Sequence, residues 1–95
     1  MPPPYRYHDE EKLVHEIAKH PDRRIAYRIH AEHQMRERKI SRLDVESILK
    51  RCVVDEMQEA GKLLVRGRDL DGTEVKIVVV PDAESKRLTV ITAMN

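Results

Sequence analysis

The strongest constraint on the fold is a change in hydrophobic periodicity at Cys52. Before Cys52, apolar residues recur at intervals of three and four, which is the spacing of one face of an α-helix. After Cys52, apolar and polar residues alternate, as they do on a half-buried β-strand. Helices followed by strands are typical of an α+β fold. We therefore predict two to three N-terminal helices packed on a four-stranded antiparallel sheet.

The first helix is expected at residues 9–19. Asp9 is its predicted N-cap, because a short acidic side chain can accept a hydrogen bond from the first turn. Pro21 ends the helix. Residues 23–27 are ambiguous, since they fit either a short extended segment or an early turn of the next helix.

Two further helices are expected before Cys52. One covers residues 29–39. Ser41 and Asp44 then form a capping-box arrangement that opens the third helix. The predicted core face of this third helix consists of Val45, Ile48, Leu49 and Cys52.

Four strands are expected after Cys52, at residues 53–59, 62–69, 73–80 and 87–94. Ala60-Gly61 marks one tight turn, and Asp71-Gly72 is a strong hairpin signal. Because the connections are short, successive strands must pair antiparallel. The third strand carries β-branched residues on both faces, which indicates a central position with Ile77 and Val79 buried.

A chain of 95 residues fits a single domain. We divide it into an extended N-terminal tail at residues 1–8, a helical part at 9–52 and an antiparallel sheet at 53–95. It contains no tryptophan and no phenylalanine, so the core must be built from aliphatic side chains and methionine.

The charge of the chain is nearly balanced overall but not locally. The formal net charge is +1, whereas residues 20–51 contain nine Lys/Arg against five Asp/Glu. This local excess suits an anionic ligand such as nucleic acid, or equally an acidic partner protein. Both possibilities stay open at this point.

Cys52 is the single cysteine, so an internal disulfide is excluded and a reducing compartment is expected. No apolar run reaches the length of a signal peptide core or of a transmembrane helix. We expect a cytoplasmic protein without a membrane partner.

A polar stripe is the main candidate for a functional site. His30, Gln34 and Arg38 follow one another at intervals of four, and residues at this spacing share one face of a helix. Ala31 and Met35 form a second, apolar stripe. The simplest interpretation of the polar stripe is the solvated outer face of an amphipathic helix.

Arg66 and Arg68 alternate along the predicted second strand and should point to the same side. With His30 and Arg38 they provide a proton carrier and guanidinium groups that stabilise phosphate charge. These groups suffice for metal-free RNA cleavage, in which the 2′-hydroxyl attacks the adjacent phosphate. Alternatively, the two arginines pair with strand acids such as Glu56 or Glu74.

Other chemistry has little support in the sequence. No glycine-rich nucleotide loop and no nucleophile-elbow serine are present. His30 and His33 could both ligate a metal from one helix, but no third ligand stands at a recognised spacing. We therefore expect no metal and no cofactor, and the role of His33 stays open.

The helix motif resembles a bacterial family of short proteins, domain-of-unknown-function family 4258. The resemblance rests on His30-Ala31, Met35, Arg38, Ile40 and Val45, with a β tail that ends in Val90-Ile91-Thr92. That family is similar to the RelE/ParE toxins, which combine helices with an antiparallel sheet. The resemblance implies a toxin–antitoxin system, RNA as substrate and a cognate antitoxin as partner.

The resemblance also suggests roles for individual residues. His30, Arg38 and Thr92 match positions that the family usually keeps. Gln34 stands where arginine is usual, and Met94 where an aromatic residue is common. Our leading hypothesis is a metal-independent endoribonuclease, with His30 and Arg38 catalytic and Gln34, Arg66, Arg68 and Thr92 binding substrate. The alternative is a non-catalytic module that binds a protein or nucleic acid. The oligomeric state stays open.

Overall fold

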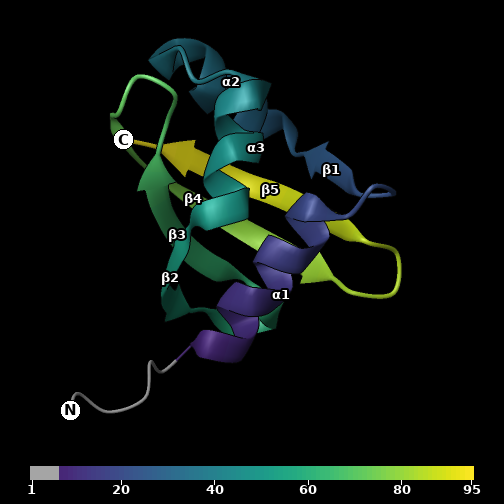
Figure 1. Ribbon diagram of the computed structural model, residues 1–95. Helices are drawn as coiled ribbons and strands as arrows, with labels where there is room; N and C mark the ends of the chain where they lie inside the picture. Colours follow the sequence, from purple (N-terminus) through teal and green to yellow (C-terminus); the bar gives the residue numbers. More distant parts are fainter. Residues whose placement is uncertain (1–6) are drawn as a thin grey trace, which may run out of the picture.

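The computed structural model describes residues 7–95 and has the predicted α+β class (Figure 1). The predicted tail at residues 1–8 lies largely outside the described residues. In chain order the elements are α1 (His8–Lys19), β1 (Arg24–Tyr27), α2 (Ile29–Arg38), α3 (Arg42–Arg51), β2 (Val53–Met57), the 3₁₀ turn η1 (Glu59–Gly61), β3 (Leu63–Arg68), β4 (Glu74–Asp82) and β5 (Arg87–Met94).

The sheet has five strands and is mixed, so the prediction of four antiparallel strands is wrong in number and in one pairing. The strand order is β1-β5-β4-β3-β2. Strands β2 to β5 form the predicted antiparallel meander, whereas β1 pairs parallel with β5. The extra strand comes from the ambiguous segment 23–27. Four residues are too few to show a period, and their pairing partner lies at the other end of the chain.

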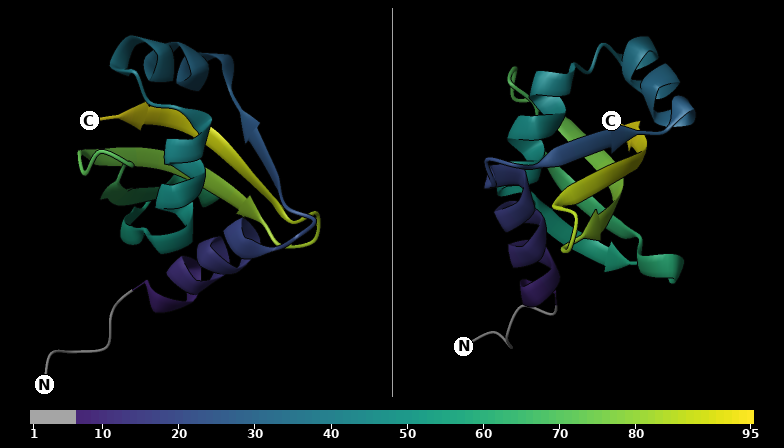
Figure 2. Two further views of the ribbon diagram at one scale, coloured as in Figure 1. Left: turned by 45° about the horizontal axis from the view of Figure 1, so that its top comes forward. Right: turned by 90° about the vertical axis from the view of Figure 1, so that its right-hand side faces the viewer.

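The helices cover the sheet unequally. Figure 1 shows α1 and α3 across one face, and Figure 2 shows α2 beyond them, over the C-terminal end of β5. The core between α1, α3 and the sheet is aliphatic. Ile77 and Val79 are fully buried there, as predicted. The predicted core face of α3 is also confirmed, since Val45, Ile48, Leu49 and Cys52 are all buried.

The N-terminal caps of the helices agree only in part with those predicted from the sequence. The Ser41 capping box is confirmed, because the Ser41 side chain accepts from the Asp44 backbone and the Asp44 side chain accepts from the Ser41 backbone. The N-cap role of Asp9 is wrong. Helix α1 begins at His8 after Tyr7, which makes no side-chain capping bond, and Asp9 lies in the first turn. A carboxylate there is still stabilised by the positive end of the helix dipole.

The strand ends differ slightly from the predictions. Strand β2 stops at Met57, and the predicted turn at Ala60-Gly61 belongs to η1. Strand β4 continues two residues past the predicted end at residue 80, because Pro81 and Asp82 still pair with β5. The Asp71-Gly72 hairpin is confirmed, since β3 and β4 on either side of it pair antiparallel.

The two outer strands of the sheet, β1 and β2, differ in whether a helix contacts their outer backbone groups. Along β2, helix α1 supplies two partners: the Glu11 carboxylate accepts from the Val54 amide at 3.0 Å, and His15 Nε2 lies 2.7 Å from the Cys52 carbonyl oxygen. These contacts occupy backbone groups that a foreign strand would otherwise bind. No element of the described chain pairs with the outer side of β1.

No helix in residues 7–95 is both long enough and apolar enough to cross a membrane.

Candidate functional site

Helix α2 places its polar stripe beside the end of the sheet. Its apolar side chains, Ala31 and Met35, are buried, whereas His30 and Arg38 are exposed. Gln34 lies between them, and its Oε1 accepts a hydrogen bond from the Ala93 amide of β5 at 2.9 Å. Gln34 therefore anchors the stripe to β5, in addition to any contact with a ligand.

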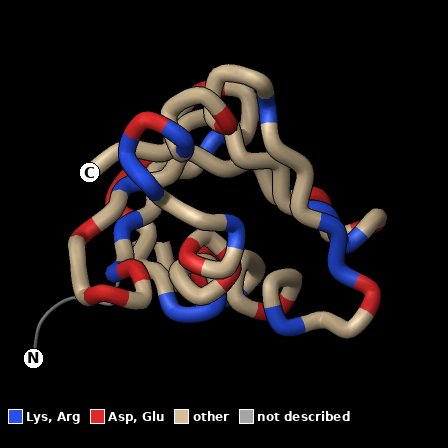
Figure 3. The backbone as a smooth tube through the Cα atoms, turned by 90° about the horizontal axis from the view of Figure 1, so that it is seen from above, with Lys and Arg blue, Asp and Glu red and all other residues tan. Residues whose placement is uncertain are grey.

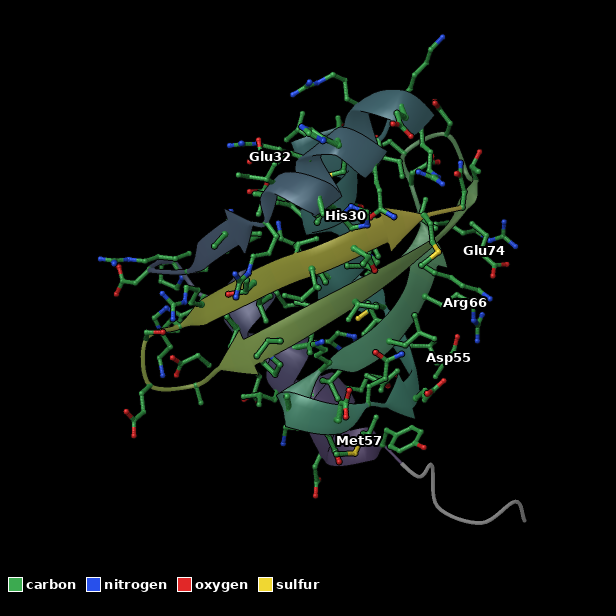
Figure 4. All side chains as sticks on the ribbon, turned by 180° about the vertical axis from the view of Figure 1, so that it is seen from behind. His30, Glu32, Asp55, Met57, Arg66 and Glu74 are labelled. Atoms are coloured by element: carbon green, nitrogen blue, oxygen red, sulfur yellow. The ribbon has the colours of Figure 1, made fainter. Side chains whose placement is uncertain are left out.

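The second face of the sheet is not crossed by α1 or α3 (Figure 4). His30 lies there between α2 and the C-terminal end of β5, while Arg66 lies on the far side of β4. We call this surface the open face. Val78 belongs to it, and at 7% exposure it is covered by its neighbours although it is not part of the main core.

A row of side chains crosses the open face between Arg66 and α2. Arg66 of β3 stands opposite Lys76 of β4, and Lys76 stands opposite Met94 of β5. Met94 follows Ala93, to which Gln34 is bonded. With strands about 4.8 Å apart, Arg66 and the end of β5 are separated by roughly 10 Å. Lys76, which is exposed, lies between them.

Lys76 is a candidate residue that sequence reasoning missed. The available signal was the alternation of Glu74 and Lys76 with the buried Val75 and Ile77, which assigns both charged residues to the open face. The alternation does not reveal the register between β3 and β4. In the structure this register places Lys76 opposite Arg66 and not opposite Arg68.

Arg66 is held by an acid on the neighbouring strand. Its Nε and one terminal nitrogen bond the two carboxylate oxygens of Asp55 at 3.0 and 3.2 Å. The pairing with a strand acid that the sequence allowed is thus present, but the acid is Asp55, not Glu56 or Glu74. The strand register shifts between Val54 and Glu56, which leaves Asp55 as the extra residue of a bulge.

Arg68 is not part of the row. One of its terminal nitrogens donates to the Gly72 carbonyl at 2.8 Å, within the hairpin. It also lines a groove of about 360 Å³ between α3 and the hairpin, together with Ser47, Arg51 and Leu70. The sequence grouped Arg66 with Arg68, but the two side chains have different partners, Asp55 of β2 for Arg66 and the Gly72 carbonyl for Arg68.

Thr92 faces the open side opposite Val78, but its hydroxyl oxygen is buried. In the described part of the chain this oxygen has no hydrogen-bond partner. An unpaired buried hydroxyl is unfavourable. A direct contact between this hydroxyl and a ligand therefore requires the covering side chains to move.

His30 and Arg38 are eight residues apart on α2, a rise of about 12 Å along the helix. Arg38 is oriented toward Glu37, with a closest approach of 3.8 Å. The His30 side chain makes no hydrogen bond with any of residues 7–95. The two predicted catalytic residues are thus on one stripe, but they are spaced to contact different parts of an extended ligand.

Charges of both signs are interspersed along the chain (Figure 3). Within residues 7–95 no group of three or more His, Cys, Asp or Glu side chains is placed to hold a metal ion. The ionisable groups of the open face that could act on a ligand are His30, Lys76 and the Arg66–Asp55 pair.

One protein family is similar to this chain in sequence. No curated protein and no solved structure matches the chain significantly. The sequence profile of one family matches residues 27–95, which include α2, α3 and all of the strands from β2 to β5. This protein belongs to the family described as Domain of unknown function (DUF4258).

Proposed function

We propose that the open face, together with the polar stripe of α2, binds RNA, and that the protein is a toxin-like, metal-independent endoribonuclease related to the RelE/ParE group. The observation that supports this most is the row across the open face. It contains an exposed ammonium group and a paired guanidinium, and the exposed imidazole of His30 lies on the α2 side of the same face.

In this mechanism His30 is the general base. A histidine side chain can accept a proton near neutral pH, and the neutral imidazole takes the proton of the ribose 2′-hydroxyl. The 2′-oxygen then bonds to phosphorus while the bond from phosphorus to the 5′-oxygen breaks. The leaving 5′-oxygen receives its proton from water, because the site is open to solvent. Lys76 stabilises the charge that builds on the phosphate oxygens.

A second function, binding without catalysis, is favoured by two observations at the same site. Asp55 neutralises Arg66, and no group among residues 7–95 orients the His30 ring through a hydrogen bond. Efficient proton carriers usually have such an orienting partner. A protein- or nucleic-acid-binding module would use the same face without cleaving its ligand.

Cleavage of a fluorescent single-stranded RNA in the presence of EDTA tests the enzyme proposal. We expect products with 2′,3′-cyclic phosphate ends and a rate that EDTA does not reduce. His30→Ala should lower the rate about 10²–10⁴-fold, which is the usual contribution of a general acid–base group. His33→Ala is the matched control, because His33 is an exposed histidine of the same helix that is not on the polar stripe.

RNA binding by the same proteins separates the two functions. Lys76→Ala should weaken binding and reduce the slope of log affinity against log salt by about 1, as expected for one lost phosphate contact. Lys19→Ala, on α1, should leave the RNA affinity and its salt dependence unchanged. A folded wild-type protein that binds RNA through Lys76 but never cleaves it would favour the binding module. A protein that neither binds nor cleaves RNA would overturn the enzyme and the nucleic-acid-binding module, and would leave only a protein ligand for this face.

A further inference from the structure

The outer side of β1 is an unpaired sheet edge. Its backbone direction follows from the bonds to β5, in which the Arg24 and Arg28 amides donate to the Lys86 and Val90 carbonyls at 2.8 and 3.0 Å. Because successive residues of a strand alternate, the amide and carbonyl of Ile25 and Tyr27 point away from β5. These groups are available to an added strand, unlike those of β2 that α1 occupies.

A groove runs beside this edge, on the side of the sheet that carries α3. It has a volume of about 340 Å³, and its lining consists of Pro21, Arg23, Ile25, Tyr27, Arg42 and Glu46. Alternate side chains of a strand added to β1 would enter this groove. Such pockets next to a free edge give sequence preference to strand addition.

Two guanidinium groups, those of Arg23 and Arg42, and one carboxylate, that of Glu46, line the groove. The excess of positive charge favours an acidic ligand. The Arg42 guanidinium lies over the Tyr27 ring at 4.8 Å from its centroid and contacts Glu32 at 3.5 Å in an exposed ion pair. Exposed pairs of this kind are weak and exchange readily. Burial raises the pKa of Tyr27 to about 12, with Glu46 adding to the effect, so the phenol stays neutral and its hydroxyl remains a donor.

We propose that the β1 edge binds an extended acidic peptide of a partner protein as a sixth strand, with carboxylates directed toward Arg23 and Arg42. A second copy of this chain fits less well. Antiparallel pairing of two β1 strands about Ala26 would place Arg24 opposite Arg28, and like charges in that position destabilise a strand pair. The proposal does not depend on RNA binding or cleavage.

A synthetic peptide of alternating glutamate and valine is a suitable probe, with a lysine–valine peptide as its charge-reversed control. Titration of the glutamate peptide into ¹⁵N-labelled protein should shift the NMR signals of the Ile25 and Tyr27 amides and slow the hydrogen exchange of these amides. The lysine peptide should produce neither effect. Affinity for the glutamate peptide should fall with added salt.

Two variants test the geometry. Arg42→Glu should weaken binding of the glutamate peptide at least about tenfold. Arg51→Glu is the same change on the same helix but outside this groove, and it should have little effect on binding. Ile25→Pro should abolish binding, since it removes an outward amide without removing a bond to β5. If the Ile25→Pro variant does not fold, the comparison of peptide binding by Arg42→Glu and Arg51→Glu still tests the proposal.

Three results would overturn the proposal. The first is equal binding of the two peptides, and the second is equal loss of affinity in Arg42→Glu and Arg51→Glu. The third is sedimentation showing that the free protein dimerises through β1, with Ile25→Pro restoring the monomer, because the occupant would then be a second copy.

Discussion

Asp44 shows how one side chain can connect two elements. One of its carboxylate oxygens accepts from the Ser41 amide at 2.8 Å in the capping box of α3, and the other accepts from the Leu70 amide at 3.0 Å in the β3–β4 hairpin. The bond from the Leu70 backbone, followed by those from Ser41, lowers the pKa of Asp44 below its ordinary value of 3.8. The folded state therefore prefers the charged carboxylate.

Asp44→Ala should lower the free energy of unfolding by about 1–2 kcal/mol at neutral pH, because it removes the carboxylate that accepts from the Ser41 and Leu70 amides. Because the pKa is lowered on folding, the carboxylate stabilises the protein above its unfolded pKa, and this is lost as pH falls through the native pKa. Urea unfolding from about pH 7 to about pH 2 should show the gap between wild type and Asp44→Asn closing. A gap that stays constant would contradict the charge argument.

At the scale of elements, the contact between α3 and the sheet depends on a missing side chain. Gly67 of β3 lies under Ile48 of α3. A Cβ added to Gly67 would be 2.8 Å from Ile48 Cγ2, closer than real Cβ atoms approach, and 3.5 Å from Ile48 Cβ, which is an ordinary contact. Both atoms belong to a fully buried side chain that cannot move aside freely.

Gly67→Ala should destabilise the protein by about 1–3 kcal/mol through overpacking. Ile48→Ala removes the obstructing methyl group, so the double variant should be more stable than the sum of the single effects by more than about 0.5 kcal/mol. Urea unfolding of the four proteins measures this coupling. Gly72→Ala provides the contrast. Its cost comes from a φ of 87° with no atom nearby, and Ile48→Ala should not relieve it.

At the scale of the whole molecule, Cys52 is a buried reporter of unfolding. It lies between α3 and β2, is 1% exposed, and its carbonyl oxygen contacts His15 of α1. Burial, with a smaller effect from Glu11, raises the pKa of its thiol to about 12. Since the thiolate is the reactive form, the folded protein should be resistant to thiol reagents.

Reaction of Cys52 with a thiol reagent at about pH 8 should be about a thousandfold slower in the folded protein than in urea, because both burial and the raised pKa suppress it. The rate should increase with urea in parallel with global unfolding. A thiol introduced by Ser85→Cys, in an exposed loop, should react at once and serves as the control. Rapid labelling of folded Cys52 would show that α1 separates from β2 without global unfolding.

Most of the local structure could be predicted from the order of the amino acids. The period of three and four located the helices, and alternation located β2 to β5, because each pattern reflects which side of one element is buried. The Ser41–Asp44 capping box and the Asp71-Gly72 hairpin depend on residues close in sequence, and both were predictable. For the same reason, His30, Gln34 and Arg38 could be assigned to one stripe of one helix.

Contacts between residues far apart in the chain became visible only in the folded molecule. It paired β1 with β5, bonded Gln34 to Ala93, and aligned Lys76 with Arg66. Asp55 became the partner of Arg66 through a bulge that shifts the register of β2. Strand register is set by how side chains of several elements share one core, and a shift of one residue reverses the face on which each side chain lies. The local pattern of a single strand contains no information about that choice.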